Sequence, residues 1–235
     1  MTYKPRQNMS NCTCEKCPVK ELVPFKTLTT DELNALADGK DTFRIMPGDP
    51  LFLEGEHMNG IYCVRAGIAK LTKLNINGQD QIVKLIAPGT LLGQEAMLTH
   101  DPANLSAIAL EEMEVCFIPK LRMISFISGN PQFSMDIIKT ISASLREADE
   151  QLVAITHKTV KQRMADTLIY LYDAFEPNKD NSLRVKLTRE ELAGMMGIAT
   201  ETCIRILSEL NKEGCIELAG KKITITDRER LVRYK

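Results

Sequence analysis

Cysteine is the residue type with the most distinctive chemistry in this chain of 235 residues, which contains seven. Three of them, Cys12, Cys14 and Cys17, are clustered near the start of the sequence, and Cys116 lies far along it. The sequence opens without an apolar stretch, so we expect no signal peptide and a cytoplasmic location, where disulfide frameworks are rare. The cysteines are therefore expected to be packing residues, metal ligands or redox groups.

Several readings of these thiols stay open. Clustered thiolates bind zinc as well as iron, and residue types alone do not separate the two metals. A reversible disulfide within the N-terminal segment is a third reading. Burial as a small core residue is the ordinary fate of a free cysteine, and it applies to Cys116, Cys63 and Cys203. Cys63, in an alternating apolar run, is kept as an alternative fourth ligand.

A second set of residues could read DNA. Residues 187–210 predict a helix, a tight turn at Gly197 and a second helix, which is the layout of a helix-turn-helix. Thr188, followed three residues later by Glu191, predicts a capping box at the start of the first helix. One face of the second helix is apolar (Cys203, Ile206, Leu207, Leu210), and the opposite face is polar (Glu201, Arg205, Ser208).

Any pair of amphipathic helices in a small domain could show this pattern. Residues 214–225, however, predict two short strands around a Gly220-Lys221 tip. Two helices, a turn and a hairpin together predict a winged helix. From Lys158 onward there are 15 Lys and Arg against 12 Asp and Glu, a charge of +3, although the whole chain carries only −1. The basic excess therefore lies on the segment with the helix-turn-helix.

The elements before it fall into three predicted parts, and the fold class is α+β. Residues 1–25 form a polar, mobile, cysteine-bearing tail. Residues 26–130 contain short alternating runs, such as 61–64 and 82–86, between glycine and proline turns, which predicts a sandwich or jelly-roll barrel. Residues 131–157 predict one long helix, and residues 158–235 hold the winged helix.

The long helix carries apolar residues at heptad spacing, which predicts a seam between two copies of the chain: Ile137, Ile141, Leu145, Ala148, Leu152 and Ile155. A helix facing the core of its own chain would give nearly the same pattern. Proteins that recognise dyad-symmetric DNA sites need to be dimers. Because no charged residue interrupts the middle of the seam, we expect a permanent homodimer. We expect no membrane segment, and no enzyme, because the three histidines are scattered and no catalytic motif occurs.

Barrel, long helix and winged helix, in that order, resemble the Crp/Fnr family of transcription regulators, which includes the catabolite activator protein and the fumarate-and-nitrate-reduction regulator. The barrel signature is carried by residues 47–56 and 62–67. The resemblance implies a jelly-roll barrel of the cyclic-nucleotide-binding type that senses a signal, a helix that dimerises, and a wing domain that binds double-stranded promoter DNA. RNA polymerase is the further partner it implies.

The resemblance also bears on the signal. The cyclic-AMP branch holds the phosphate with an arginine before a Ser-Ala pair, and here Leu105 precedes Ser106. Leucine cannot offset the cost of burying a phosphate, so we do not expect cyclic AMP, although a pose using Lys84 or Arg65 stays open.

The oxygen-sensing branch holds a 4Fe-4S cluster with three clustered thiolates and one distant thiolate. Cys14, Cys17 and Cys116 match its pattern, whereas its third clustered position falls on Val23, so that Cys12 would have to replace it. Zinc, haem, a small molecule in the barrel, or no metal are the alternatives.

The family contacts base edges from the second helix, at positions that match Glu201 and Arg205. A carboxylate can accept from the amino group of cytosine, and a guanidinium can donate twice to guanine, or hold a phosphate instead. Ile204 could meet a thymine methyl or pack against the wing. The expected DNA-contact set is Thr188, Thr200, Glu201, Ile204, Arg205, Ser208, Lys221 and Lys222, the two lysines on phosphates.

Overall fold

The computed structural model describes residues 7–8, 13–22, 24–74 and 80–234, without the side chains of residues 7, 8, 155 and 156. The chain divides into two compact units, one of residues 1–73 and 83–145 and the other of residues 74–82 and 146–235. Among the helices of the described residues, none is both long enough and apolar enough to cross a membrane.

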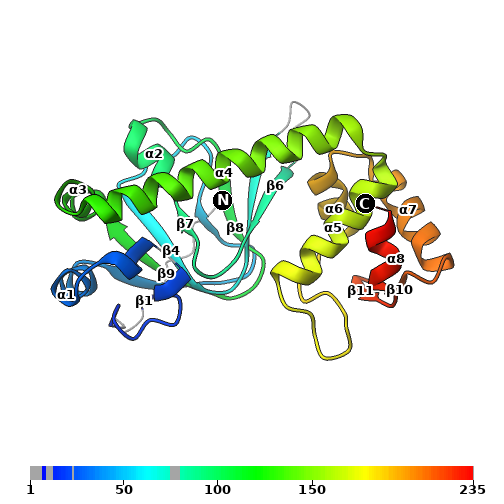
Figure 1. The fold of residues 1–235 in the computed structure, drawn as a ribbon, viewed down its shortest axis with the longest axis horizontal. Coiled ribbons are helices and arrows are strands. Elements are labelled where there is room, and N and C mark those ends of the chain that lie inside the picture. Colours follow the sequence, from blue (N-terminus) through cyan, green and yellow to red (C-terminus); the bar gives the residue numbers. More distant parts are fainter. Residues whose placement is uncertain (1–6, 9–12, 23, 75–79, 235) are drawn as a thin grey trace. The chain divides into compact units, whose positions relative to one another are not determined.

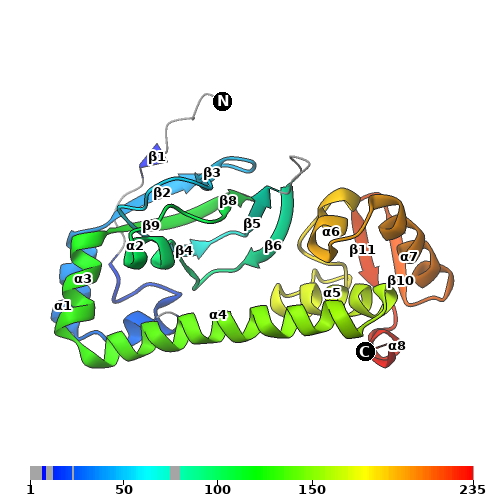
Figure 2. The same ribbon diagram turned by 90° about the horizontal axis from the view of Figure 1, so that it is seen from above.

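Two sheets form the barrel (Figure 1 and Figure 2). The first contains, in spatial order, β1 (Gln7–Asn8), β2 (Asp41–Ile45), β9 (Met113–Pro119), β4 (Gly60–Ala66) and β7 (Leu91–Leu92). The second contains β3 (Pro50–Phe52), β8 (Ser106–Ala109), β5 (Ala69–Leu74) and β6 (Asp80–Ile86). The strands are short and separated by glycine turns, so the predicted jelly-roll architecture is confirmed.

Alternation along the central strands gives the first sheet two different faces. Tyr62 and Val64 of β4 face the interior of the barrel, in a buried cluster to which both sheets contribute. Ile61 and Cys63 face the other way and belong to a second buried cluster. β9 alternates in the same manner, with Cys116 on the second face.

The second cluster is closed by residues of the N-terminal segment and by helices: η2 (Pro24–Thr27), α1 (Thr30–Asp38), α2 (Gln94–Thr99), α3 (Lys120–Gly129) and the start of α4 (Pro131–His157). The short helix η1 (Lys20–Leu22) precedes them and buries none of its side chains. The ring centroid of Phe133 lies 6.0 Å from the ring centroid of Phe25 and 6.2 Å from that of Phe126. Cys14 and Val19 are buried in this cluster. Residues 13–22, which we expected to belong to a mobile tail, thus contribute two buried side chains to the barrel, while Leu22 is 67% exposed.

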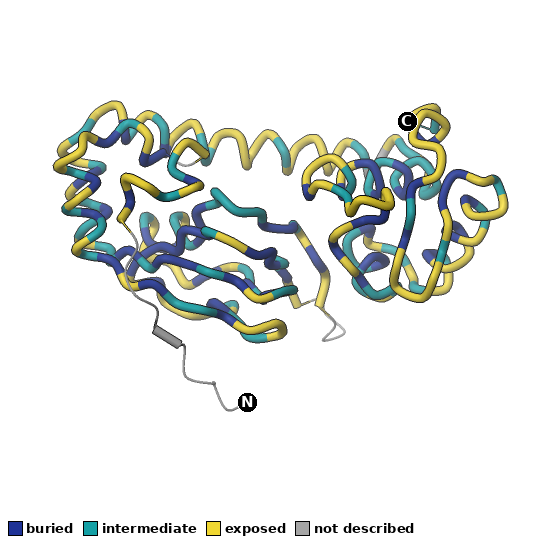
Figure 3. Tube along the Cα trace, turned by 90° about the horizontal axis from the view of Figure 1, so that it is seen from below, coloured by how far each residue is buried: buried dark blue, intermediate teal, exposed yellow. Residues whose placement is uncertain are grey.

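The long helix α4 divides its apolar residues between two tasks. Ile137 is only 4% exposed because it packs into the barrel cluster beside Phe133, so its assignment to a dimer seam is wrong. The adjacent Ile138 is 55% exposed and restores the heptad spacing with Ile141, which is half-buried. Leu145 is 64% exposed, and Ala148 and Leu152 are also exposed. The middle turns of α4 are mostly exposed (Figure 3). The side chain of Ile155 lies outside the described residues.

The second unit contains the predicted winged helix. Its elements are α5 (Val160–Ala174), α6 (Arg189–Met196), α7 (Thr200–Lys212), β10 (Ile216–Ala219), β11 (Lys222–Ile225) and α8 (Arg228–Arg233). Gly197 ends α6 in the left-handed conformation at φ 62°, which glycine adopts without the cost that a side chain would incur. β10 and β11 pair around the Gly220-Lys221 tip.

The predicted capping box starts α6. The amide of Glu191 donates to Thr188 Oγ1 at 3.0 Å, and the amide of Thr188 donates to Glu191 Oε2 at 2.9 Å. Each side chain thus satisfies an amide that has no partner within the helix. This arrangement fixes where the first helix of the pair begins.

We predict that Thr188→Ala destabilises this end of α6 by about 0.5–2 kcal/mol, since it removes the hydroxyl acceptor. Amide hydrogen exchange of the full-length protein should become faster in the first turn of α6. Thr200→Ala is the matched control, because Thr200 lies inside α7 and the cap position of that helix is Ala199. Unchanged exchange in α6 would show that the cap contributes nothing measurable.

Candidate functional site

Two strands fix the first pair of thiols. β4 and β9 are antiparallel, and Cys63 is the direct cross-strand partner of Cys116. Both side chains are buried on the outer face of the sheet. The hydroxyl of Thr42, on β2, lies 3.7 Å from Cys116 Sγ. Because strand pairing sets this register, neither thiol can leave the site without breaking the sheet.

A tight turn presents the second pair. The amide of Cys17 donates to the carbonyl of Cys14 at 3.2 Å, and the amide of Lys20 donates to the carbonyl of Cys17 at 3.1 Å. Two residues separate the cysteines, so the first hydrogen bond closes a four-residue turn with a cysteine at each end. Cys14 is buried and Cys17 is half-buried.

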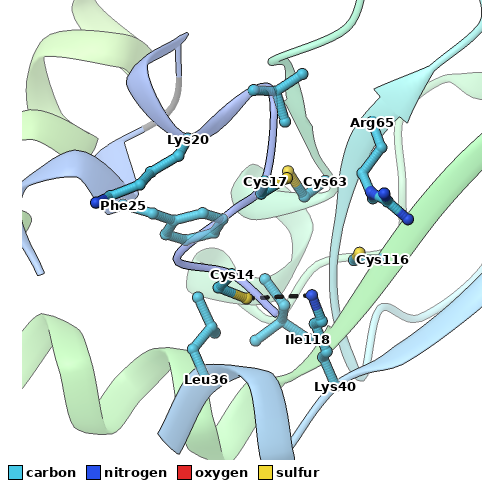
Figure 4. Close-up of a pocket in the computed structure, with 11 residues that line it drawn as sticks. Cys14, Cys17, Lys20, Phe25, Leu36, Lys40, Cys63, Arg65, Cys116 and Ile118 are labelled. Atoms are coloured by element: carbon cyan, nitrogen blue, oxygen red, sulfur yellow. Dashed lines mark hydrogen bonds between the residues drawn. The ribbon is translucent and has the colours of Figure 1, made fainter. Parts of the chain in front are cut away.

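All four thiols line one cavity (Figure 4). Its apolar wall includes Phe25, Leu36 and Ile118. The cavity measures about 20 Å³, which is room for roughly one water molecule. Among the described residues, no group of three or more Cys, His, Asp or Glu side chains is arranged to hold a single metal ion. The thiols therefore share a cavity without forming a finished single-ion site.

Positive charge faces these thiols. Lys40 is only 4% exposed, and its ammonium donates to Cys14 Sγ at 3.1 Å (Figure 4). Arg65 also lines the cavity, and its Nη1 lies 3.4 Å from a carboxylate oxygen of Glu114. Burying an ammonium is costly unless negative charge lies nearby. Lys40 therefore makes this cavity favourable for an anionic group.

The protonation of Cys63 follows from its surroundings. Burial raises the pKa of its thiol, the neighbouring Cys116 and Cys17 raise the pKa further, and Lys40 opposes them. Cys63 is thus a neutral thiol in the folded chain. A metal ion reverses this situation, because a coordinated thiol loses its proton.

The structure brings three of the four predicted metal ligands together, namely Cys14, Cys17 and Cys116. Cys12, the fourth, lies outside the described residues. Cys63 joins the set, although the sequence favoured a core role for it. The available signal was its alternation with Tyr62 and Val64, which places it on the opposite face of β4 from the barrel interior. Lys40 and its contact with Cys14 were missed, because nothing local links residues so far apart.

The positions at which the cyclic-AMP branch of the family binds its nucleotide carry other residues and contacts in this chain. Leu105 is half-buried where that branch has its arginine, and the hydroxyl of Ser106 accepts from the amide of Glu54 at 2.9 Å. Arg65, which had been left open as a substitute cation, lies in the thiol cavity on the outer face of β4. It therefore does not point into the interior of the barrel.

The predicted DNA-contact residues divide by exposure. On α7, Glu201, Arg205 and Ser208 are exposed and Ile204 is 50% exposed. Thr200 and Thr188 are half-buried, and the Thr188 hydroxyl is engaged in the helix cap. The guanidinium of Arg205 bonds Glu209 Oε1 at 2.6 Å, one turn further along the same helix. Arg205 must exchange or share this partner to reach a base or a phosphate.

The wing hairpin is held to α6 and to the loop between α5 and α6. Arg189 Nη2 donates to the carbonyl of Gly220 at 2.8 Å. Lys222 Nζ lies 2.6 Å from Asp180 Oδ2, and this hydrogen bond lowers the pKa of the Asp180 carboxyl. Lys221 is exposed at the tip. Of the two wing lysines, Lys222 is thus ion-paired within the chain.

Comparison with known proteins matches both units. A Crp-like helix-turn-helix domain covers residues 162–234, and a cyclic nucleotide-binding domain covers residues 42–130. The chain belongs to the Crp/Fnr family of transcription regulators. It is therefore a DNA-binding regulator of transcription and not an enzyme.

Relatives of this Crp/Fnr regulator come from more than one branch. It is 28% identical over 224 residues to the "Anaerobic regulatory protein" of Pasteurella multocida, covering 93% of this chain and 81% of the relative. It is 27% identical over 188 residues to the "CRP-like cAMP-activated global transcriptional regulator" of Mycobacterium tuberculosis H37Rv, covering 79% and 84%. The solved structure of FixK2 from Bradyrhizobium japonicum shares the fold, with a TM-score of 0.74 and 21% identity over 83% of this chain and 97% of that one.

We predict that Arg205→Ala lowers the specific DNA affinity of this Crp/Fnr regulator by about 1–3 kcal/mol, because it removes the guanidinium that we expect to contact a base edge. Lys221→Ala should instead weaken specific and nonspecific binding alike, because it removes a contact to a phosphate. The slope of log K for DNA binding against log salt concentration should become smaller by about 1. Fluorescence anisotropy with a selected site and a scrambled site, at several salt concentrations, measures both quantities. Equal losses on the two sites for Arg205→Ala would assign Arg205 to the phosphates.

Proposed function

We propose that this Crp/Fnr regulator senses oxygen or redox state through an iron–sulfur cluster of the 4Fe-4S type. Cys14, Cys17 and Cys116, together with one further thiol, would hold the cluster. The observation that carries the proposal is the shared cavity, since thiols from the N-terminal turn and from β9 line the same space. The similarity to an anaerobic regulatory protein supports it.

The donor set fits such a cluster, because 4Fe-4S clusters in proteins are held by four cysteine thiolates. The charge also fits, since the buried ammonium of Lys40 bonds one of the thiols and favours an anionic group. The free volume of about 20 Å³ does not fit without movement, because it holds roughly one water molecule. Residues 13–19 would have to move outward. When bound, the cluster supplies a group that reacts with oxygen.

A cluster of packed side chains connects this site to the long helix α4. Cys14 and Phe25 belong to the same buried cluster as Phe133 and Ile137, which are the residues that attach α4 to the barrel. The rings of Phe25 and Phe133 lie 6.0 Å apart. Outward movement of the N-terminal segment would therefore disturb the residues that hold the start of α4. We propose this as the route by which the sensing site changes DNA binding.

The active species would be a homodimer on double-stranded promoter DNA, with RNA polymerase as a further partner. Ile138, Ile141, Leu145, Ala148 and Leu152 supply the heptad face. Exposed leucines at this spacing are typical of helices that pair with a second copy. A dimer presents two copies of α7 to the two halves of a symmetric site.

Anaerobic purification tests the sensing proposal directly. Iron, acid-labile sulfide and zinc are measured per chain, together with the visible absorption spectrum, before and after air is admitted. We expect about four irons and four sulfides per chain and a colour that bleaches in air. Stoichiometric zinc would make the site structural, and a colourless protein without metal would exclude sensing through a cluster at these thiols.

We predict that Leu145→Glu shifts the protein from dimer to monomer at micromolar concentration, because it places charge in the middle of the apolar seam. Sedimentation velocity measures the change. Ala143→Glu is the matched control, since Ala143 is exposed on the far side of the heptad. A Leu145→Glu protein that remains dimeric would show that α4 is not the dimer contact.

A further inference from the structure

Cys63 occupies a position that no spacing pattern in the sequence assigns to a metal. It is buried on the outer face of β4, directly opposite Cys116, and its thiol lines the same cavity as those of Cys14 and Cys17 (Figure 4). Two of these thiols come from strands and two from the turn. The number of thiols around the cavity therefore equals the number that a 4Fe-4S cluster requires.

The backbone holds Cys63 in place independently of the N-terminal turn. The strand register ties it to Cys116, and Cys63 also pairs with Leu91 on β7. A side chain in the middle of three paired strands is positioned in advance, whereas a ligand from a terminal segment must be ordered when the metal binds. Cys63 and Cys116 thus form a fixed half of the site, to which the turn adds the other half.

The charges of the cavity suit four thiolates. The buried ammonium of Lys40 donates to Cys14 Sγ at 3.1 Å, so a cation already lies at the cavity that four thiolates would make anionic. Thiols that coordinate a metal lose their protons, so four thiolate ligands would place negative charge beside Lys40.

We propose that Cys63 is the fourth thiolate ligand of the iron–sulfur site, so that the ligand set is Cys14, Cys17, Cys63 and Cys116, and that Cys12 is not a ligand. This inference rests on the proposed function, since it names the ligands of the same site. The cluster would then bridge the N-terminal turn to two neighbouring strands. The barrel itself would contribute as many ligands as the turn.

Three variants of the full-length protein test the ligand set after anaerobic purification: Cys63→Ala, Cys12→Ala and Ile61→Val. Ile61 lies on the same strand and the same face as Cys63 and is fully buried, so Ile61→Val controls for loss of packing without loss of a thiol. Iron and sulfide per chain are measured alongside the absorption spectrum, and circular dichroism reports folding. We expect Cys63→Ala to lose most of its iron and sulfide, while Cys12→Ala and Ile61→Val match the unsubstituted protein.

The outcomes separate the two proposals. Unsubstituted protein without iron and sulfide overturns the proposed function, and the ligand set with it. If the unsubstituted protein carries the cluster, then its loss in Cys12→Ala, or its retention in folded Cys63→Ala, overturns the ligand set alone. Should Cys63→Ala fail to fold, Cys12→Ala still decides, because full iron content in that variant leaves Cys63 as the remaining thiol of the cavity.

Discussion

The pairing of β4 with β9 is the constraint on which the barrel and its thiol cavity depend. Their register places Tyr62 and Val64 inside the barrel and Cys63 and Cys116 outside it. The strands can approach closely because Gly60 has no side chain: a Cβ there would lie 2.2 Å from the carbonyl oxygen of Ile118. A shift of one residue would exchange the two faces, turning the thiols into the barrel and the aromatic core outward.

Charge is the second constraint on the site. The outer face of this strand pair is apolar, and a lysine buried there is expensive unless an anion accompanies it. The hydrogen bond between Lys40 and Cys14 brings the ammonium to a group that can become anionic. Apolar walls strengthen this interaction, because water screens it less.

The sequence predicted some parts of this molecule far better than others, and the difference lies in the range of the interactions. The capping box at Thr188, the turn at Gly197 and the apolar face of α7 all depend on residues three to seven positions apart, and all appear in the structure. The association of Cys63 with Cys14 depends on how a turn packs against a strand pair, which no local pattern encodes. Ile137 and Ile138 fit the heptad equally well by type, and only the position of the barrel core decides between them.

The burial of Ile137 in place of Ile138 also offers a way to couple the thiol cavity to the proposed dimer face. Neighbouring residues on a helix point about 100° apart, so the burial of Ile137 fixes the rotation of α4 and with it the direction of Ile138 and the seam that follows. Phe133 and Ile137 belong to the same buried cluster as Phe25 and Cys14. Interdigitated side chains of this kind change between discrete arrangements more readily than they deform. A displaced N-terminal turn would therefore alter the rotation or the tightness of α4 at its base, and a change at the base of a continuous helix is carried along its whole seam.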